Sequence, residues 1–253
     1  MRRETRDLAE ALGLRPRDHV ALVGGGGKTT VMFALADQLK AKGSTVLTST
    51  TTKVWEQQAQ KAPSVILEGS GPQWKEELVQ VLDRHHYAFI AGERLASGKL
   101  QGISPTLADR LFRDRVVDYL ILEADGAAGR PVKAPARYEP VIPRTATVVV
   151  AMAGLEALGK PCTDEWVFRA ERFMELTGAR QGEFLKPVIL ARLLQHQRGL
   201  FQGCPKGARR IIFLNKVDLV QDRTWLDELV GILAGKCRLV LGSVKEGIYQ
   251  VHR

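Results

Sequence analysis

Cysteine is scarce in the 253-residue sequence, and its placement does not suit a metal site or a disulfide framework. The three cysteines, Cys162, Cys204 and Cys237, lie far apart and form no C-x-x-C pair. Structural zinc sites need closely spaced cysteine or histidine ligands, and small secreted scaffolds use an even set of cysteines. We therefore expect no structural zinc site and a reducing, cytoplasmic environment.

Long apolar runs are also missing. No stretch of the sequence is apolar enough over the length that a bilayer requires. Glu4, Asp7 and Glu10 interrupt the apolar positions of residues 1–14, so this segment lacks the continuous core of a signal peptide. We expect a protein without a membrane partner.

Basic residues outnumber acidic ones, but they do not form one block. The formal net charge is +9 and the isoelectric point is near 9.6. The basic residues are spread along the chain and mixed with acidic ones, whereas nucleic-acid-binding domains usually gather them on one face. We expect the charge to attract phosphate-bearing small molecules or an acidic protein rather than nucleic acid.

The sequence is organised around a glycine-rich stretch near its start. An apolar run from His19 to Val23 leads into four glycines and then Lys-Thr-Thr, which predicts a strand, a phosphate-binding loop and the start of a helix. Glycine backbone N–H groups can turn toward an anion, and the helix N-terminus adds partial positive charge. Lysine in this pattern reaches the β and γ phosphates, and the next hydroxyl binds the Mg²⁺ that bridges them. The predicted phosphate-binding residues are Gly24, Gly25, Gly26, Gly27, Lys28, Thr29 and Thr30.

The beginning of this loop departs from the full P-loop pattern. In G-x-x-x-x-G-K-[ST] the first glycine would fall at Leu22, so we expect a loop that is shorter or entered differently. A flexible turn is the simpler alternative, but it does not explain Lys-Thr-Thr at the start of a helix. A dinucleotide-binding G-x-G-x-x-G pattern from Gly24 would need glycine at Thr29. Phosphate binding is therefore the favoured interpretation.

Strand and helix patterns alternate along most of the chain. They predict an α/β P-loop NTPase fold, with a mainly parallel sheet and helices on both faces. We expect one domain over residues 1–253, with an insertion around 155–205. The apolar spacing near the start predicts a first helix from Arg2 to Leu14.

A cluster of hydroxyl residues follows the predicted strand from Thr45 to Thr48. Residues 49–52 are Ser-Thr-Thr-Thr, which is too polar for a buried strand to continue. Because ligands gather beyond the carboxyl ends of parallel strands, Thr50 is a candidate ligand of Mg²⁺. A threonine-rich strand edge is the alternative for any one of these residues.

A second apolar strand, from Val117 to Leu122, ends in two carboxylates, Glu123 and Asp125. At the end of a strand beside a phosphate loop, such acids hold Mg²⁺ or position the attacking water. Asp125 is the first choice for the metal and Glu123 is the second. An ordinary acidic exit from a strand is the alternative.

Prolines keep residues 127–143 out of a regular helix, so we expect an ordered loop that crosses the active face. Arg130 and Lys133 in this loop could neutralise charge that develops during phosphoryl transfer. They could equally be solvated.

The strand over residues 210–214 is followed by Asn-Lys-Val-Asp, a tetrapeptide that binds guanine in many GTPases. Its carboxylate can accept hydrogen bonds from guanine N1–H and the exocyclic amine, which adenine does not offer; a surface loop is the alternative. We expect Asn215 to join this loop to the phosphate loop and the Lys216 stem to lie along the base. The loop that begins at Ser243 resembles a second base-binding loop, whose backbone N–H meets guanine O6. The predicted base-binding residues are Asn215, Lys216, Asp218 and Ser243.

Several segments together resemble the YqeC family, P-loop proteins described as accessory factors of selenium-dependent molybdenum hydroxylases. The segments are G-G-G-G-K-T-T, T-S-T-T-T-K, L-E-A-D-G-A-A-G-R-P-V-K-A-P-A, E-P-V-I-P and L-N-K-V-D. The resemblance runs from about Leu14 to the C-terminus. It implies a fold akin to nucleotide-dependent metallocentre-maturation GTPases and a role in maturing or inserting a molybdenum cofactor. The positions that it carries over are Lys28, Thr29, Thr30, Glu123, Asp125, Arg130, Lys133, Asn215, Lys216 and Asp218.

These features predict a protein that binds Mg²⁺ and GTP, with ATP as the alternative. Slow hydrolysis would switch a partner, such as a molybdenum hydroxylase or a cofactor-maturation protein. No residue stands out as a general base for water, which agrees with slow turnover. A small-molecule kinase and a nucleotide-sensing scaffold that does not hydrolyse remain alternatives. The candidate catalytic residues are Lys28, Glu123, Asp125 and Arg130.

Overall fold

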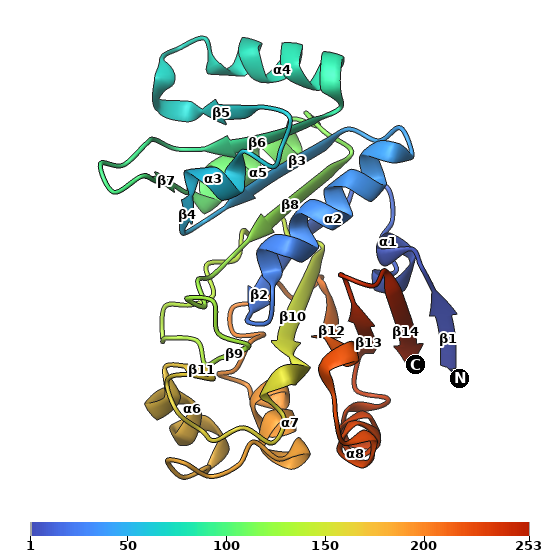
Figure 1. The fold of residues 1–253 in the computed structure, drawn as a ribbon. Helices are drawn as coiled ribbons and strands as arrows, with labels where there is room; N and C mark the ends of the chain where they lie inside the picture. The colour runs from blue at the N-terminus through green and yellow to red at the C-terminus, as the bar shows by residue number, and fades with distance from the viewer. Residues whose placement is uncertain (1, 253) are drawn as a thin grey trace.

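The computed structural model describes residues 2–252 and is built on one ten-stranded sheet (Figure 1). In sheet order the strands are β1 (Arg2–Thr5), β14 (Ile248–His252), β13 (Arg238–Ser243), β12 (Arg209–Asn215), β10 (Val148–Gly154), β2 (His19–Gly24), β8 (Tyr119–Glu123), β3 (Val46–Thr50), β6 (Tyr87–Ala91) and β5 (Val65–Leu67). Neighbouring strands from β13 to β5 are parallel, whereas β14 pairs antiparallel with both β13 and β1. The sheet is therefore mainly parallel, as predicted.

Two small ribbons lie beside the main sheet. One is the antiparallel pair β4 (Lys53–Trp55) and β7 (Lys99–Gln101), and the other is the parallel pair β9 (Val132–Lys133) and β11 (Val167–Phe168). Both ribbons lie on the left in Figure 1. The β9–β11 pair joins the loop after β8 to the segment between β10 and β12.

Helices cover both faces of the sheet. They are α1 (Leu8–Leu12), α2 (Lys28–Ala41), α3 (Glu56–Ala59), α4 (Trp74–His85), α5 (Pro105–Arg113), α6 (Ala170–Thr177), α7 (Pro187–Gln195) and α8 (Arg223–Leu233), with short 3₁₀ turns η1 (Glu68–Ser70), η2 (Leu155–Ala157) and η3 (Val217–Leu219). Successive side chains of a strand point to opposite faces. In β2, Val20 and Leu22 join the core with α1, α2 and α3, whereas Ala21 and Val23 join the core with α4, α5, α7 and α8. The predicted α/β architecture with helices on both faces is confirmed.

The predicted first helix is wrong over its first half. Residues Arg2–Thr5 form the edge strand β1, in which Thr5 lies opposite Tyr249 of β14. The helix is confined to Leu8–Leu12, because Asp7 caps its start and Gly13, with φ 63, ends it. The strand was not predicted because its partner lies at the other end of the chain.

The buried strand β3 continues through Thr50, so the expected end at Thr48 is wrong. The residues Thr48, Ser49 and Thr50 are all buried. Ser49 Oγ donates to Ile90 O at 2.7 Å, and Thr50 Oγ1 donates to Glu123 O at 3.2 Å. Carbonyls of the neighbouring strands thus satisfy the hydroxyls, which removes most of the cost of burying them.

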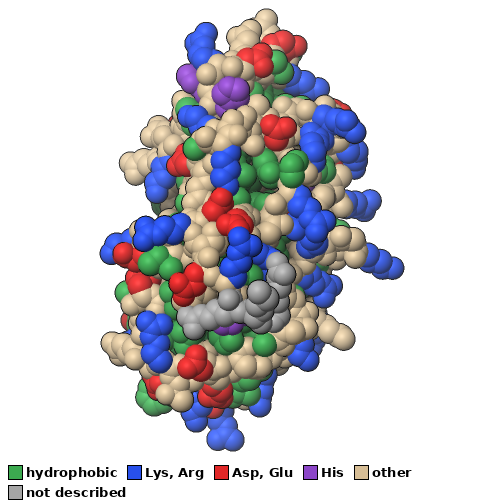
Figure 2. All heavy atoms as spheres, turned by 90° about the vertical axis from the view of Figure 1, so that its right-hand side faces the viewer, with side chains coloured by type: hydrophobic (Ala, Val, Ile, Leu, Met, Phe, Trp, Pro, Cys, Tyr) green, Lys and Arg blue, Asp and Glu red, His purple; other side chains and the backbone are tan. Residues whose placement is uncertain are grey.

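Charged side chains are mixed on the face shown in Figure 2. Lys and Arg side chains are spread over most of its height, with Asp and Glu side chains among them. Within residues 2–252, no helix is both long enough and apolar enough to span a membrane.

Candidate functional site

The glycine-rich loop joins β2 to α2 and packs closely against its neighbours. Gly26 has φ 77 and Gly27 has φ 101, a left-handed conformation that other residues rarely adopt. A side chain on Gly26 would also overlap with the backbone of Gly154 at the end of β10. The Gly26 N–H donates to Arg130 O at 3.2 Å. The loop is therefore held between β10 and the segment that follows β8.

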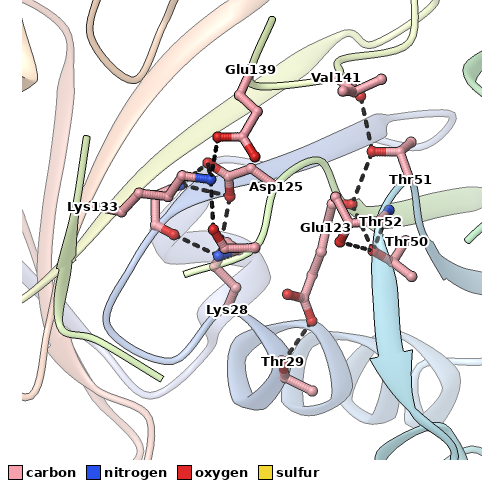
Figure 3. Close-up of polar contacts among 12 residues, drawn as sticks. Lys28, Thr29, Thr50, Thr51, Thr52, Glu123, Asp125, Lys133, Glu139 and Val141 are labelled. Carbon is pink, nitrogen blue, oxygen red and sulfur yellow. Dashed lines mark hydrogen bonds and ion pairs between the residues drawn. The ribbon is translucent and has the colours of Figure 1, made fainter. Parts of the chain in front are cut away.

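The ammonium group of Lys28 is buried and turned back onto this loop (Figure 3). Lys28 Nζ donates to Gly24 O at 2.5 Å and lies 3.1 Å from Asp125 Oδ1. The two carboxylate oxygens of Asp125 also accept from the Gly24 N–H, at 3.1 and 3.0 Å. Asp125 therefore holds the lysine at the loop through a buried ion pair.

The first turn of α2 has the features of an anion site. The helix begins at Lys28 without a capping side chain and without an acid in its first turn, and Thr30 is exposed there. The first N–H groups of a helix have no intrahelical acceptor, and together with the helix dipole they favour an anion. The geometry of this turn suits a phosphate group.

Glu123, the last residue of β8, contacts the hydroxyl of Thr29, the residue after Lys28. Thr29 Oγ1 donates to Glu123 Oε1 at 2.7 Å (Figure 3). The contact forms because β8 is the parallel neighbour of β2, with Glu123 opposite Leu22. Leu22 thus lies inside β2, which agrees with a loop shorter than the full pattern. Burial raises the pKa of Glu123, and the Lys28 charge and the Thr29 hydrogen bond oppose this shift.

A line of alternating charges runs from the phosphate loop into the rest of the protein. The ammonium of Lys133 is fully buried, 3.2 Å from Asp125 Oδ2 and 2.8 Å from Glu139 Oε2, and it donates to Gly126 O at 2.6 Å. The alternative that Lys133 is solvated is therefore wrong. Arg169, at the start of α6, pairs with Glu139 from the other side. Burial alone would raise the pKa of Glu139, but hydrogen bonds from Arg169 and Lys133 lower it below its usual value.

Thr50 and Arg130 bind nearby main chain. Thr50 Oγ1 donates to Glu123 O, which ties the end of β3 to β8. The Arg130 guanidinium donates to Asp164 O and to Ala128 O, both at 2.8 Å. Both side chains therefore stabilise the loops around the site in this structure.

Asn215 joins the predicted base loop to the phosphate loop, as expected. Its Nδ2 donates to Gly26 O at 2.8 Å, and its Oδ1 accepts from the Val244 N–H at 3.3 Å. Asn215 ends β12, and Ser243 ends the neighbouring strand β13. The parallel pairing of these strands brings the two candidate base loops side by side.

The remaining base-loop residues differ in their surroundings. Lys216 has φ 64 and pairs with Glu156, whereas Asp218 is exposed in η3. Ser243 is buried, and its Oγ accepts from the Glu246 N–H at 3.3 Å.

Sequence reasoning missed three charged residues at this site: Glu139, Glu156 and Arg169. None of them belongs to the motifs near the phosphate loop or the base loop. Glu139 stands in the E-P-V-I-P segment, which was the one available signal. Glu156 follows the end of β10, a position that only the strand order places between the two loops.

Comparisons with known proteins give a family. The family model for the YqeC protein matches residues 20–171. A protein of Escherichia coli strain K12, "Uncharacterized protein YqeC", is 32% identical over 226 residues, which cover 87% of this chain and 84% of that protein.

Two solved structures show weaker similarity. HypB from Helicobacter pylori in complex with nickel is 11% identical, with a TM-score of 0.40 over 96% of this chain and 84% of that one. Chloroplast FtsY from Physcomitrella patens is 15% identical, with a TM-score of 0.33 over 96% of this chain and 54% of that one. The family model and the E. coli relative, by contrast, cover most of the chain, and the protein belongs to the YqeC family.

Proposed function

We propose that the protein binds a nucleoside triphosphate together with Mg²⁺, prefers GTP to ATP, and hydrolyses it slowly. The observation that carries this proposal is the contact between Thr29 and Glu123 beside a glycine loop and a buried lysine. It brings a hydroxyl and a carboxylate together at the carboxyl end of parallel strands, where phosphate-bound Mg²⁺ is held in P-loop proteins.

The residues around the loop are assigned to three roles: binding the phosphates, binding Mg²⁺ and positioning Lys28. The first-turn N–H groups of α2 and the Lys28 ammonium would bind the β and γ phosphates. Thr29 and Glu123 would hold Mg²⁺, which neutralises phosphate charge when bound. Asp125 is assigned to position Lys28, because its carboxylate is occupied by two ammonium groups and a backbone N–H. Glu123, rather than Asp125, is then the carboxylate on the metal side.

Thr50 and Arg130 complete the proposed phosphate site. Thr50 is placed on the metal side, because its hydroxyl lies next to the backbone of Glu123. Arg130 is placed on the phosphate side, because its carbonyl contacts Gly26 of the loop.

The loops after β12 and β13 would bind guanine. Asp218 would accept from N1–H and the exocyclic amine, and the Ser243 loop would meet O6. The support is the hydrogen bond from Asn215 to Gly26, which fixes the base loop relative to the phosphate loop. Sites built on such polar matches discriminate strongly, since the wrong base leaves a charge unpaired.

We further propose that nucleotide state switches a partner in the maturation of a molybdenum hydroxylase, a role that family membership suggests. Residues 155–205 lie between β10 and β12, and we treat them as an insertion into a single domain. The insertion contacts the site through the pair of Arg169 with Glu139.

Exchange of the base tests the guanine assignment. Asp218→Asn should weaken GTP binding about 10- to 100-fold and strengthen binding of xanthosine triphosphate, because an amide can donate to the xanthine 2-oxo group. Fluorescent nucleotides report both affinities, and Asp227→Asn, an exposed carboxylate change in α8, is the control. Unchanged GTP affinity in Asp218→Asn would mean that the tetrapeptide is only a turn.

A further inference from the structure

A carboxylate outside the base-binding motif holds the lysine of that motif. Glu156 lies in η2, directly after β10, and its Oε1 pairs with the ammonium of Lys216. The Glu156 side chain is only 16% exposed, and η2 packs against η3, the turn that follows Lys216. The ion pair therefore fixes the end of a lysine whose backbone, with φ 64, already has a restricted conformation.

Gly154 makes room for this carboxylate. The backbone of Gly154 has φ −88 and ψ 123, which alanine adopts without strain. The nearest atoms to a Cβ at this position would all belong to the carboxylate group of Glu156. The Glu156 side chain thus occupies the space that a side chain on Gly154 would need.

The same glycine touches the phosphate loop. Its N–H donates to Pro131 O at 2.8 Å, and its backbone fills the space beside Gly26. Lys216 is therefore linked to the phosphate loop through Glu156 and Gly154, and Asn215 provides a second, separate link.

We infer that Glu156 is a positioning residue for the nucleotide base, an inference that rests on the proposed function. Lysine is flexible, and an unanchored Lys216 would lose many rotamers when a base lies along its methylene stem. The ion pair with Glu156 restricts the stem before the nucleotide arrives. Glu156 thereby strengthens the contact between Lys216 and the nucleotide base, and it makes no contact with the phosphates.

Tripolyphosphate separates the base contribution from the phosphate contribution. Glu156→Gln should bind GTP about fivefold more weakly than the wild type and bind tripolyphosphate with unchanged affinity. Glu228→Gln, which changes an exposed carboxylate in α8, should leave both affinities unchanged. Equal weakening of both ligands, or no weakening of GTP, would overturn the inference. If wild-type GTP binds no more tightly than ATP and tripolyphosphate, the proposed guanine site itself fails.

A double-mutant cycle tests the role of Gly154. Gly154→Ala should displace the carboxylate and weaken GTP binding as Glu156→Ala does, and the double variant should be no weaker than Glu156→Ala alone. If Gly154→Ala weakens GTP binding equally in the Glu156→Ala background, its effect does not act through Glu156, and the role assigned to Gly154 is wrong.

Discussion

Replacing Lys133 with methionine should reveal how strongly the buried charges depend on one another. The Lys133 ammonium is fully buried and binds Asp125, Glu139 and the Gly126 carbonyl. Methionine fills a similar volume but removes the charge. The buried carboxylates of Asp125 and Glu139 would then lie near each other without the cation that separates them.

The cost follows from what each carboxylate retains. Breaking a buried ion pair by removing one partner typically costs 3–5 kcal/mol. Here Asp125 keeps Lys28, and Glu139 keeps Arg169, so neither carboxylate is left without a cation. We expect the lower end, about 3 kcal/mol, which is a large part of a typical unfolding free energy of about 5–15 kcal/mol.

Urea unfolding followed by tryptophan fluorescence measures this loss. The matched control is Lys206→Met, an exposed lysine whose replacement should change the free energy of unfolding by less than about 0.5 kcal/mol. Adding Glu139→Gln to Lys133→Met should cost less than the sum of the two single changes, because Glu139 has already lost one of its two cations when Lys133 is replaced. A loss below about 1 kcal/mol for Lys133→Met would mean that the buried carboxylates do not depend on the Lys133 charge.

Three further predictions concern the metal side, the loop and a buried histidine. Glu123→Gln or Thr29→Val should raise the Mg²⁺ concentration needed for GTP binding about 10- to 100-fold, and an unchanged requirement in a Mg²⁺ titration would argue against the metal site. Gly26→Ala should lower the unfolding temperature and abolish GTP binding, because it combines a positive φ with overlap of backbone atoms; wild-type melting and binding would contradict this. Burial lowers the pKa of His19 from 6.5 to about 4, so the folded protein resists protonation and should lose up to about 3 kcal/mol between pH 6.5 and 4. Urea unfolding between pH 6.5 and 4 should show this loss in the wild type and in the control His86→Asn, and His19→Gln should lack it. If the free energy of unfolding of His19→Gln falls equally steeply with pH, His19 is not the source of the loss.

The glycine loop and the acidic strand end could be predicted because each depends on residues close together in the sequence. The Asn215 link spans 189 residues and could be expected only because the Asn-Lys-Val-Asp pattern is shared with many GTPases. The different contacts of the two carboxylates could not be predicted: Glu123 meets Thr29, and Asp125 meets Lys28. Residues at alternate positions of an extended chain share a side, but Asp125 lies beyond the end of β8, where the chain leaves the strand direction. Which carboxylate meets Thr29 therefore depends on where β8 ends and on its register with β2.

The ion pairs between residues far apart in the sequence could not be predicted either. Glu156 reaches Lys216 because β10 and β12 are neighbours, although about 60 residues separate them in the chain. Arg169 reaches Glu139 because β9 pairs with β11. The sequence pattern of each residue, taken alone, resembles an ordinary surface charge.

Calorimetric titration of the wild-type protein with GTP and with ATP, each with and without Mg²⁺, tests both the proposed phosphate site and the proposed guanine site. We predict Mg²⁺-dependent binding of both nucleotides at one site, with GTP at least about tenfold tighter because of the carboxylate match to guanine. Equal affinities for GTP and ATP would contradict the base site, and binding of neither nucleotide would contradict the phosphate site at Lys28 and Thr29.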